Sequence, residues 1–461
     1  MAMEDNPEWN PLVRRVLFFT GLIVLAEPLA ATMLLSFVAF MVRDFPAVDN
    51  DRVAFWCGLL TSAYFVAQVF TAPIYGILSD RIGRKPVLLF GLVGSAVCTV
   101  IFGTAKNTTV AIVSRVLCGV FNGNAGVSRT AIGELAVNHN LHQGRAFALF
   151  GFCTALGTLI GPLLGGFLCQ PAEKYRFDGP GGMFKIYPYL LPCLIGAGYN
   201  ITIVALSVLF LPETNIEIKG RSQETEDAAS EETPLLPQDR DETTKDPPKN
   251  MTGLVVLMLC YLSITLHVIA FDDMYPVVAA TLPPIGLGYT SIQVATTLLL
   301  TSPVLFAVQL IGYPILSTRF SYTKLWGLSS ILFLFVYLAC PFAILLPAGS
   351  WLQWSSFCGL LAIRISAVVI GYTSLAVLLA LAAPPNARGA TVSIAQAVVS
   401  ASRAVGPALA GALWSWGLSN HLPAPLNQNI LFLFMCLAAA LQVMTTFGLS
   451  FSDFQESVQS K

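Results

Sequence analysis

Long apolar segments, separated by short polar turns, follow one another along almost the whole chain. Windows of about 19 residues identify segments long enough to cross a hydrocarbon core of ~30 Å at ~1.5 Å per helical residue. They predict twelve spans, at residues 16–41, 55–78, 87–104, 109–132, 146–168, 188–210, 252–280, 290–316, 323–346, 355–382, 390–417 and 428–450. We therefore expect an all-α integral membrane protein, and the even number of spans predicts that both ends of the chain lie on one side.

The composition excludes a water-soluble fold. Of 461 residues, 55% are hydrophobic and 11% are charged, whereas about a quarter of an average soluble chain is charged. The formal net charge of −1 also argues against a nucleic-acid partner, because phosphate binding needs concentrated lysine and arginine. The ten cysteines lie mostly inside apolar segments without a CxxC spacing. We interpret them as buried apolar residues and expect no metal site.

The distribution of basic residues between the short loops predicts the orientation. On the side of the N-terminus the sequence places Arg14, Arg15, Arg81, Arg84, Lys85, Arg145, Arg319, Lys324 and Arg388. The opposite side has Arg43, Arg52, Lys106, Lys174, Arg176 and Lys185, which acidic neighbours partly offset. Because lysine and arginine accumulate in cytoplasmic loops, both termini are expected to be cytosolic.

An acidic segment divides the spans into two groups of six. It is rich in Glu, Asp, Ser, Thr and Pro, so we expect a disordered linker at 212–250 between bundles at 16–211 and 251–450, with cytosolic ends at 1–15 and 451–461. The sequence GPLLGG at 161–166, in the fifth span, is echoed by GPALAG at 406–411, in the fifth span of the second group. This echo is typical of a parallel duplication.

Three motifs lie at characteristic places relative to the spans: GILSDRIGRK at 76–85, RVLCG at 115–119 and GTLIGPLLGG at 157–166. Together they resemble the motifs of the major facilitator superfamily, and the resemblance covers essentially the whole chain. The resemblance implies two six-helix bundles that transport a small solute by alternating access. The third motif resembles that of proton-coupled antiporters, and so implies protons as the coupling ion.

Four shorter segments narrow the resemblance: Glu27-Pro28, QPAEKY at 170–175, LPET at 211–214 and FDD at 271–273. They are similar to the zinc-induced-facilitator-like branch and its fungal relatives. The plant members carry a cysteine motif in the first external loop, which this chain lacks at 43–52.

The charged turn at 76–85 has two interpretations. Its glycines would permit close backbone approach and a positive φ, and Asp80 is placed to cap a helix or to face the positive end of a helix dipole. It is either a latch that shuts the cytosolic side in the outward-facing state or a set of charges that only fixes the topology. The predicted gate comprises Gly76, Asp80, Arg81, Gly83, Arg84, Lys85 and a partner beyond the fourth span, Glu134.

Small residues in the fifth span predict close helix packing. Gly157, Gly161 and Gly165 recur every four residues and leave one helix face without side chains. Pro162 removes a backbone hydrogen bond and should bend the helix. We assign Gly166 and the second-half residues Arg403, Gly406 and Pro407 to packing as well.

Ionisable residues at membrane depth are the candidates for function, since a central charge costs at least ~2.5–3.5 kcal/mol. Glu27 lies near mid-bilayer and is either a proton or substrate site or half of a buried ion pair. Arg115 and Arg364 either stabilise a carboxylate or contact an anionic substrate. Tyr64 and Gln68 share one face of the second span and either line the cavity or join helices.

The seventh span carries three further candidates. Asp272 and Asp273 are adjacent, so they point ~100° apart, and only one is expected to face the cavity while the other meets the external interface. His267 is either a hydrogen-bonded core residue or a proton relay.

We predict a secondary transporter that exports a small amphipathic metabolite or drug in exchange for protons. The alternatives are a proton-independent uniporter and a non-transporting receptor. No GxxxxGK[ST] loop, Ser/His/Asp arrangement or HExxH motif indicates ATP use or an enzyme, and no cofactor is expected. The expected partners are the solute, protons and the lipid bilayer, with the protein a monomer. The plasma membrane is favoured, and an acidic dileucine pattern at Glu231, Leu235 and Leu236 makes the vacuolar membrane the alternative.

Overall fold

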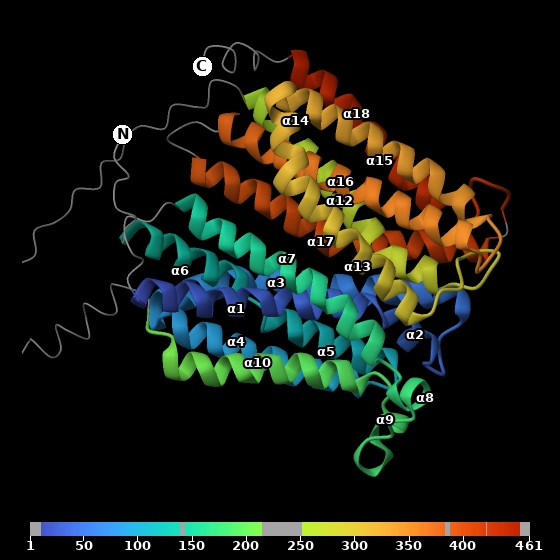
Figure 1. Cartoon of the computed structure of the whole chain (residues 1–461), viewed down its shortest axis with the longest axis horizontal. Helices are drawn as coiled ribbons and strands as arrows, with labels where there is room; N and C mark the ends of the chain where they lie inside the picture. Colours follow the sequence, from blue (N-terminus) through green and yellow to red (C-terminus); the bar gives the residue numbers. More distant parts are fainter. Residues whose placement is uncertain (1–10, 139–142, 214–250, 383–387, 421, 452–461) are drawn as a thin grey trace, which may run out of the picture.

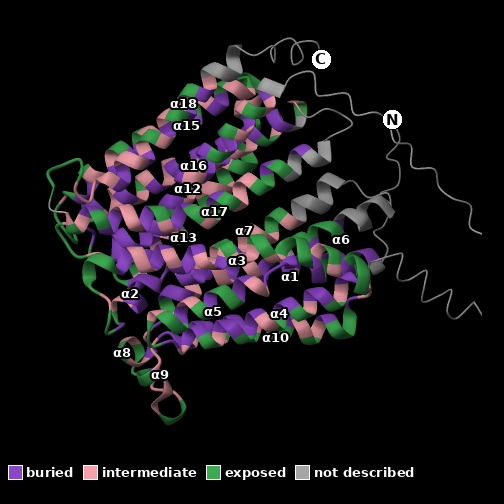
Figure 2. Cartoon of the chain, turned by 180° about the vertical axis from the view of Figure 1, so that it is seen from behind, coloured by how far each residue is buried: buried purple, intermediate pink, exposed green. Residues whose placement is uncertain are grey.

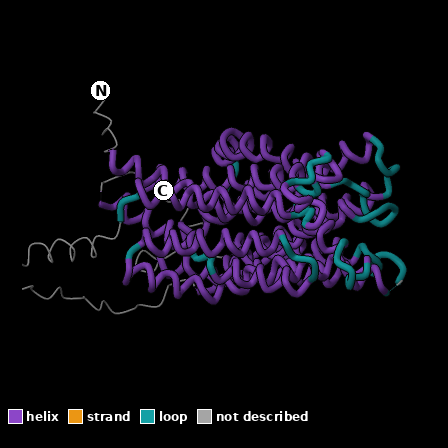
Figure 3. Tube along the Cα trace, turned by 90° about the horizontal axis from the view of Figure 1, so that it is seen from below, coloured by secondary structure: helices purple, strands orange, loops and turns teal. Residues whose placement is uncertain are grey.

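The computed structural model describes residues 11–138, 143–213, 251–382, 388–420 and 422–451. Within these ranges every regular element is a helix, as the tube in Figure 3 shows. The predicted linker beyond Glu213, with Glu231, Leu235 and Leu236, lies outside the described residues.

The N-terminal half contains six membrane-crossing segments and two short helices, α8 (Pro171–Tyr175) and α9 (Met183–Ile186). The crossing segments are α1 (Pro11–Leu35) with α2 (Val38–Arg43), α3 (Val53–Ile82), α4 (Arg84–Gly103), α5 (Thr108–Val120) with α6 (Asn124–Asn138), α7 (Gln143–Leu168) and α10 (Leu190–Phe210).

The C-terminal half repeats this number of crossings. They are α12 (Met251–Ala280), α13 (Ser291–Ala307) continued through a π-helical turn by α14 (Tyr313–Arg319), α15 (Tyr322–Ile344), α16 (Trp351–Ala382), α17 (Arg388–Ser419) and α18 (Ile430–Phe451). Figure 1 shows the two halves as separate groups of helices, blue to green and yellow to red. Ten helical segments of the described chain are individually long and apolar enough to span a membrane. The predicted all-α membrane fold is confirmed.

The fourth span is broken, although the sequence analysis treats it as continuous. α5 ends at Val120 and α6 begins at Asn124, and the turn between them contains Asn122-Gly123, a dipeptide that favours turns. Gly123 lies against the Tyr75 ring of α3, where a side chain would not fit. The Asn122 carbonyl, which the break frees from the helix, accepts a hydrogen bond from the Gln68 side chain.

Helix pairs in the two halves follow one scheme. α1 packs on α7 as α12 packs on α17, and α4 packs on α10 as α15 packs on α18. Across the halves, α3 packs on α17 and α7 packs on α13, which again relates equivalent spans. This arrangement agrees with the duplication inferred from the repeated Gly-Pro sequences.

In the described chain the two halves share one hydrophobic cluster, and its members from the N-terminal half lie at one end. We call the end where α1 begins and α18 ends the terminal end, and the opposite end, where α2 lies, the distal end (Figure 1). The distal cluster combines Phe37 and Cys57 with Tyr275 and Ala279 of α12. The cluster near the start of α1, which contains Leu17, consists within the described chain of residues from the N-terminal half. Figure 2 shows the buried residues concentrated between the helices and the exposed ones on the outer faces.

The predicted glycine face of α7 packs on α1. A Cβ atom added at Gly157, Gly161 or Gly165 would lie within 2.1–2.7 Å of a backbone carbonyl oxygen of α1, so the two backbones approach as closely as helices can. Ser36 of the α1–α2 junction also donates a hydrogen bond to the carbonyl of Pro162, at 3.0 Å. The second-half counterpart is looser, because a Cβ at Gly406 would meet α12 atoms at an ordinary 3.7 Å.

In each half, the glycine five residues after the glycine of the repeated Gly-Pro pair contacts the backbone of the other half. A Cβ on Gly166 would lie 2.6 Å from the Ser291 carbonyl oxygen of α13, and one on Gly411 would lie 2.3 Å from the Ala54 carbonyl oxygen of α3. Gly58 completes the second contact, because its Cβ would lie 2.2 Å from the Pro407 carbonyl oxygen. The distal end is therefore closed by backbone-to-backbone contacts at equivalent positions of the repeat.

Gly411→Val should open the distal end. Overpacking costs about 1–3 kcal/mol, which would shift the equilibrium away from this closed arrangement by roughly 5- to 150-fold. Cys57, one turn from Ala54 and 2% exposed, should react faster with a water-soluble maleimide, measured by peptide-resolved mass spectrometry. Gly198→Val is the matched control, since a Cβ there meets nothing within 4 Å. An unchanged Cys57 labelling rate in Gly411→Val would contradict the assignment of the Gly411 contact to closure of the distal end.

Candidate functional site

Glu27 interacts with a neutral partner rather than with an arginine. Its Oε1 accepts a hydrogen bond from the Gln68 amide of α3 at 2.9 Å, and the same amide nitrogen donates to the Asn122 carbonyl at 3.1 Å. Within the described chain no lysine or arginine lies within ion-pair distance of this half-buried carboxyl group. Gln68 thus connects the carboxyl of α1 to the break in the fourth span.

Arg115 is held by aromatic rings. It is 6% exposed, and its guanidinium lies 4.6 Å from the ring centroid of Tyr64 and 5.7 Å from that of Phe102. The Tyr64 hydroxyl in turn accepts a hydrogen bond from the Asn122 amide. Aromatic faces attract a desolvated cation, but they leave its Nε without a hydrogen-bond partner.

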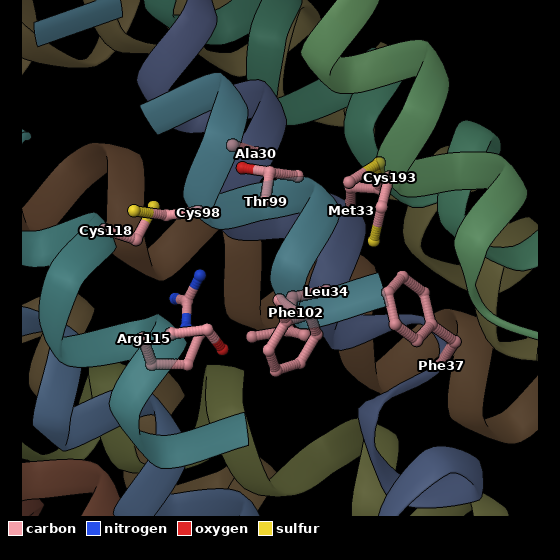
Figure 4. A pocket seen from close by; sticks show the side chains of 11 residues that line it. Ala30, Met33, Leu34, Phe37, Cys98, Thr99, Phe102, Arg115, Cys118 and Cys193 are labelled. Carbon is pink, nitrogen blue, oxygen red and sulfur yellow. The ribbon is translucent and has the colours of Figure 1, made fainter. Parts of the chain in front are cut away.

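A small cavity lies beside Arg115. Figure 4 shows Arg115 together with side chains that reach the same space from α1, α4 and α10, including Met33, Thr99 and Cys193. Its volume is about 10 Å³, which is close to the room needed for one water molecule. In this conformation the cavity is too small for an organic solute.

Arg364 pairs with Asp272 in the C-terminal half. Its Nη1 lies 2.8 Å from the Asp272 Oδ1, and its Nη2 donates to the Val268 carbonyl at 2.8 Å. The guanidinium also lies 4.3 Å from the centroid of the Phe271 ring. The arginine side chain is 5% exposed and the aspartate side chain 50% exposed, so the pair presents its carboxylate outward and its cation inward.

The two adjacent aspartates face different surroundings, as their spacing predicts. Asp272 is the exposed one, whereas Asp273 is 7% exposed and interacts with the Thr61 hydroxyl of α3. Because α12 and α3 belong to different halves, Asp273 lies at the closed interface.

His267 lies in the core of the C-terminal half. It is 0% exposed, and its ring nitrogens lie 2.8 Å from the Tyr337 hydroxyl and 2.8 Å from Gln442 Oε1. The Gln442 nitrogen donates to Ser329, so Oε1 accepts and Nε2 carries the imidazole proton. We therefore interpret His267 as the hydrogen-bonded core residue rather than a proton relay.

Two further arginines approach this region. Arg403, assigned above to packing, is exposed and lies 5.8 Å from the Phe65 ring centroid across the halves. Arg129 of α6 is also exposed, lies 5.1 Å from the Phe150 ring centroid, and is close enough to interact electrostatically with Glu27 and Arg403. Arg129 is not among the residues predicted from the sequence, although it lies inside the fourth predicted span.

The turn between α3 and α4 is shorter than predicted. α3 continues to Ile82, which places Gly76 inside the helix. A Cβ at Gly76 would meet nothing within 4 Å, so its expected role in close approach is wrong. Gly83 does meet the expectation, since its φ is +104° and a Cβ there would lie 2.5 Å from a Glu213 oxygen.

Glu213 caps the N-terminus of α4. Its two carboxylate oxygens accept hydrogen bonds from the backbone amides of Arg84 at 2.9 Å and Lys85 at 3.0 Å. These amides lack intrahelical partners, and the positive end of the helix dipole attracts the carboxylate. Glu213 therefore provides the helix cap that the sequence suggested for Asp80. The only sequence signal for Glu213 is the LPET segment at 211–214.

The other charged residues of the turn at 76–85 differ in their contacts and exposure. Asp80 pairs with Arg84 at 2.5 Å, Arg84 also donates to Ser79, and Lys85 donates to the Val208 carbonyl at 2.9 Å. Arg81 is exposed. The side chain of Glu134 lies outside the described residues.

Hydrogen bonds reinforce the closed distal end. Arg43 donates to the Ala280 carbonyl, the last residue of α12, at 2.7 Å, and Lys174 donates to the Ser291 hydroxyl at 2.6 Å. Ser62 and Ser415 accept from backbone amides of the opposite half, at 2.9 and 3.0 Å. All four bonds join α1–α3 or α8 to the second half.

The described residues contain no group of three or more His, Cys, Asp or Glu side chains arranged to hold a metal ion. The polar site instead consists of single charges, each held by amides, aromatic rings or one counter-ion. Such an arrangement suits binding and release of a solute or a proton better than covalent chemistry.

Comparison with known proteins places these features in a family. Residues 20–407 match the model of the Major Facilitator Superfamily. The chain is 30% identical to the "Major facilitator superfamily multidrug transporter mfsB" of Aspergillus fumigatus, over 90% of this chain and 80% of the relative. It is 28% identical to "Protein ZINC INDUCED FACILITATOR-LIKE 1" of Arabidopsis thaliana, over 95% and 92%. A solved D-xylose-proton symporter superposes with a TM-score of 0.70 at 12% identity, covering 96% of this chain and 98% of the symporter.

Glu213→Gln should destabilise the N-terminal half by about 1–2 kcal/mol, because a neutral amide loses the interaction with the α4 dipole and one of its two acceptor oxygens. The apparent Tm of the purified protein should fall by several degrees. Glu173→Gln, an exposed carboxylate on α8, is the control and should leave Tm unchanged. Equal Tm values for both variants would exclude Glu213 as a stabilising cap.

Proposed function

Because the chain belongs to the Major Facilitator Superfamily of transporters, we propose that it exports a small amphipathic organic solute in exchange for protons. Alternating access requires two arrangements of the halves, each closed at one end. The distal end is closed here by equivalent glycine contacts and by hydrogen bonds across the halves. If the basic loops at the terminal end are cytosolic, this is the inward-facing arrangement.

The contacts of the Glu27 carboxyl group are the main support for this function. Glu27 is a carboxyl group inside the membrane whose hydrogen-bond partner is a glutamine, and in the described chain no arginine or lysine lies within ion-pair distance of it. It is therefore the candidate proton carrier. Protonation would weaken the charge-assisted bond from Gln68. That amide also holds the Asn122 carbonyl, so a proton on Glu27 alters the contact between α1, α3 and the broken span.

The same break connects Glu27 to Arg115. Asn122 accepts from Gln68 through its carbonyl and donates to Tyr64 through its side chain, and the Tyr64 ring lies under the Arg115 guanidinium. A change at Glu27 would therefore be transmitted toward Arg115, which has no carboxylate at ion-pair distance in the described chain. This chain of contacts supports a site in which proton binding and solute binding influence each other.

The charges that surround the site support an amphipathic solute with an acidic or polar group. Arg115 and Arg364 are buried cations, and Arg129 and Arg403 are exposed ones, while aromatic rings supply the apolar contacts. The similarity to a relative named as a multidrug transporter agrees with this solute class. A uniporter remains the competing function, and it is separated by the response to a pH gradient.

Glu27→Gln should abolish gradient-driven transport, since an amide keeps the shape of the carboxyl group but cannot carry the proton. Wild type and variant are reconstituted in proteoliposomes, and movement of a panel of amphipathic solutes is followed with and without an imposed pH gradient. We expect at least about a tenfold loss of gradient-driven flux in the variant. Glu173→Gln, on the distal surface, should transport as wild type does.

Flux that is independent of the gradient in wild type and equal in Glu27→Gln would overturn the proposal. It would favour facilitated diffusion and return Glu27 to a structural role.

A further inference from the structure

A small polar chamber, which Asn122 helps to line, lies inside the N-terminal half. Its volume is about 20 Å³, enough for one water-sized occupant. Four elements and the break in the fourth span enclose it, and its lining is Ile23, Val24, Ala26, Glu27, Leu92, Ser95, Asn122, Asn124 and Asn200. Five of these nine residues carry a side-chain oxygen, an unusual concentration for the middle of a membrane bundle.

Asn124 provides an oxygen that has no hydrogen-bond partner within the described chain. The residue is 7% exposed, and its Nδ2 donates to the Leu88 carbonyl at 3.2 Å, which fixes the orientation of the amide. Its Oδ1 is buried without a hydrogen-bond partner. Gly91 makes room for this oxygen, since a Cβ there would lie 2.3 Å from it. Leaving a buried acceptor unsatisfied is unfavourable, so an occupant that binds this oxygen would stabilise the folded state.

The neighbouring amides leave further oxygens for the same occupant. Asn122 uses its Nδ2 on the Tyr64 hydroxyl, so its Oδ1 remains. Asn200 of α10 is 3% exposed and lines the chamber with Ser95 of α4. These groups lie on elements that are far apart in sequence, and the broken span brings them together.

Glu27 is the one formal charge in the lining. Gln68 occupies Oε1, which leaves the second oxygen for the chamber. A water molecule would satisfy hydrogen bonds, but it would leave the carboxylate without a counter-ion at ion-pair distance in the described chain. A monovalent cation satisfies both the charge and the amide oxygens, whereas one carboxylate does not neutralise a divalent ion.

The donor set selects the kind of cation. Carboxylate, amide and hydroxyl oxygens are hard ligands that suit s-block cations rather than copper or zinc. Broken membrane helices supply such sites in transporters, because their free carbonyls and C-terminal ends attract cations. The end of α5 at Val120 lies at this break.

We propose that this chamber binds one sodium ion, held by the Glu27 carboxylate, the amide oxygens of Asn122, Asn124 and Asn200, and the Ser95 hydroxyl. The inference rests on the proposed function only through the shared Glu27. A bound ion joins α1, α4, α6 and α10, and it occupies the carboxylate that would otherwise take a proton. Sodium is then a second ion, besides the proton, that binds the Glu27 carboxylate.

Thermal unfolding of the purified full chain tests the site without any transport assay. NaCl is titrated against choline chloride at constant ionic strength, with KCl in parallel. A ligand that binds the folded state raises its stability with concentration, so we expect a saturable rise in Tm with sodium. Asn124→Leu, nearly isosteric, should weaken the apparent sodium affinity at least about tenfold. Gln442→Leu removes a buried amide from the other half and should keep the sodium response.

A direct measurement covers the case in which Asn124→Leu fails to fold. Binding of radioactive sodium is then measured for wild type and for Asn200→Leu. The sodium affinity of the variant should fall by about the same factor, at least about tenfold. An equal effect of sodium, potassium and choline on wild type would mean that the chamber holds water only, and would overturn the inference. Sodium binding that both asparagine variants retain would overturn it as well. Sodium binding in a protein whose transport ignores the pH gradient would sustain the site while refuting proton-coupled export.

Discussion

The absence of water from the hydrocarbon core is the constraint on which the structure depends. Every backbone polar group inside the membrane must find a partner in the protein, so the described chain crosses as helices, and irregular backbone is tolerated where side chains satisfy it. The break in the fourth span obeys this rule, because Gln68 supplies the hydrogen bond that the Asn122 carbonyl lost. The polar groups at the centre of the molecule are therefore arranged around the break between α5 and α6.

The same constraint governs the charges. A buried cation needs compensation, and Arg364 finds it in Asp272, whereas Arg115 lies between aromatic rings. Aromatic faces attract a cation less strongly than a carboxylate does, which leaves Arg115 more receptive to an anionic group. Glu27 is the complementary case, a carboxyl whose hydrogen-bond partner is neutral. Asn122 connects the two, because its carbonyl accepts a hydrogen bond from Gln68 and its amide donates one to Tyr64.

Backbone contacts join the two halves at the distal end. Gly166 and Gly411 occupy equivalent positions of the repeat and pack on α13 and α3 without side chains between them. Contacts of this kind depend steeply on distance, because each brings a helix backbone against a backbone carbonyl. The hydrogen bonds of Arg43 and Lys174 end at a backbone carbonyl and a hydroxyl of the other half, and water can replace those partners when the distal end opens.

Periodicity and composition by themselves determined the membrane class, the twelve crossings and the two halves, since apolar length and repeated Gly-Pro positions are properties of the chain. Glu27, Arg115 and Arg364 were also recognisable, because a charge at membrane depth is costly wherever its partners lie. Tertiary structure alone decided which partner each charge has. It assigned Asp272 rather than Asp273 to Arg364, placed His267 in the core, gave the α4 cap to Glu213 and brought Asn122, Asn124 and Asn200 together at the broken span. Those outcomes depend on distances between helices that are remote in sequence, and helical periodicity carries no information about such distances.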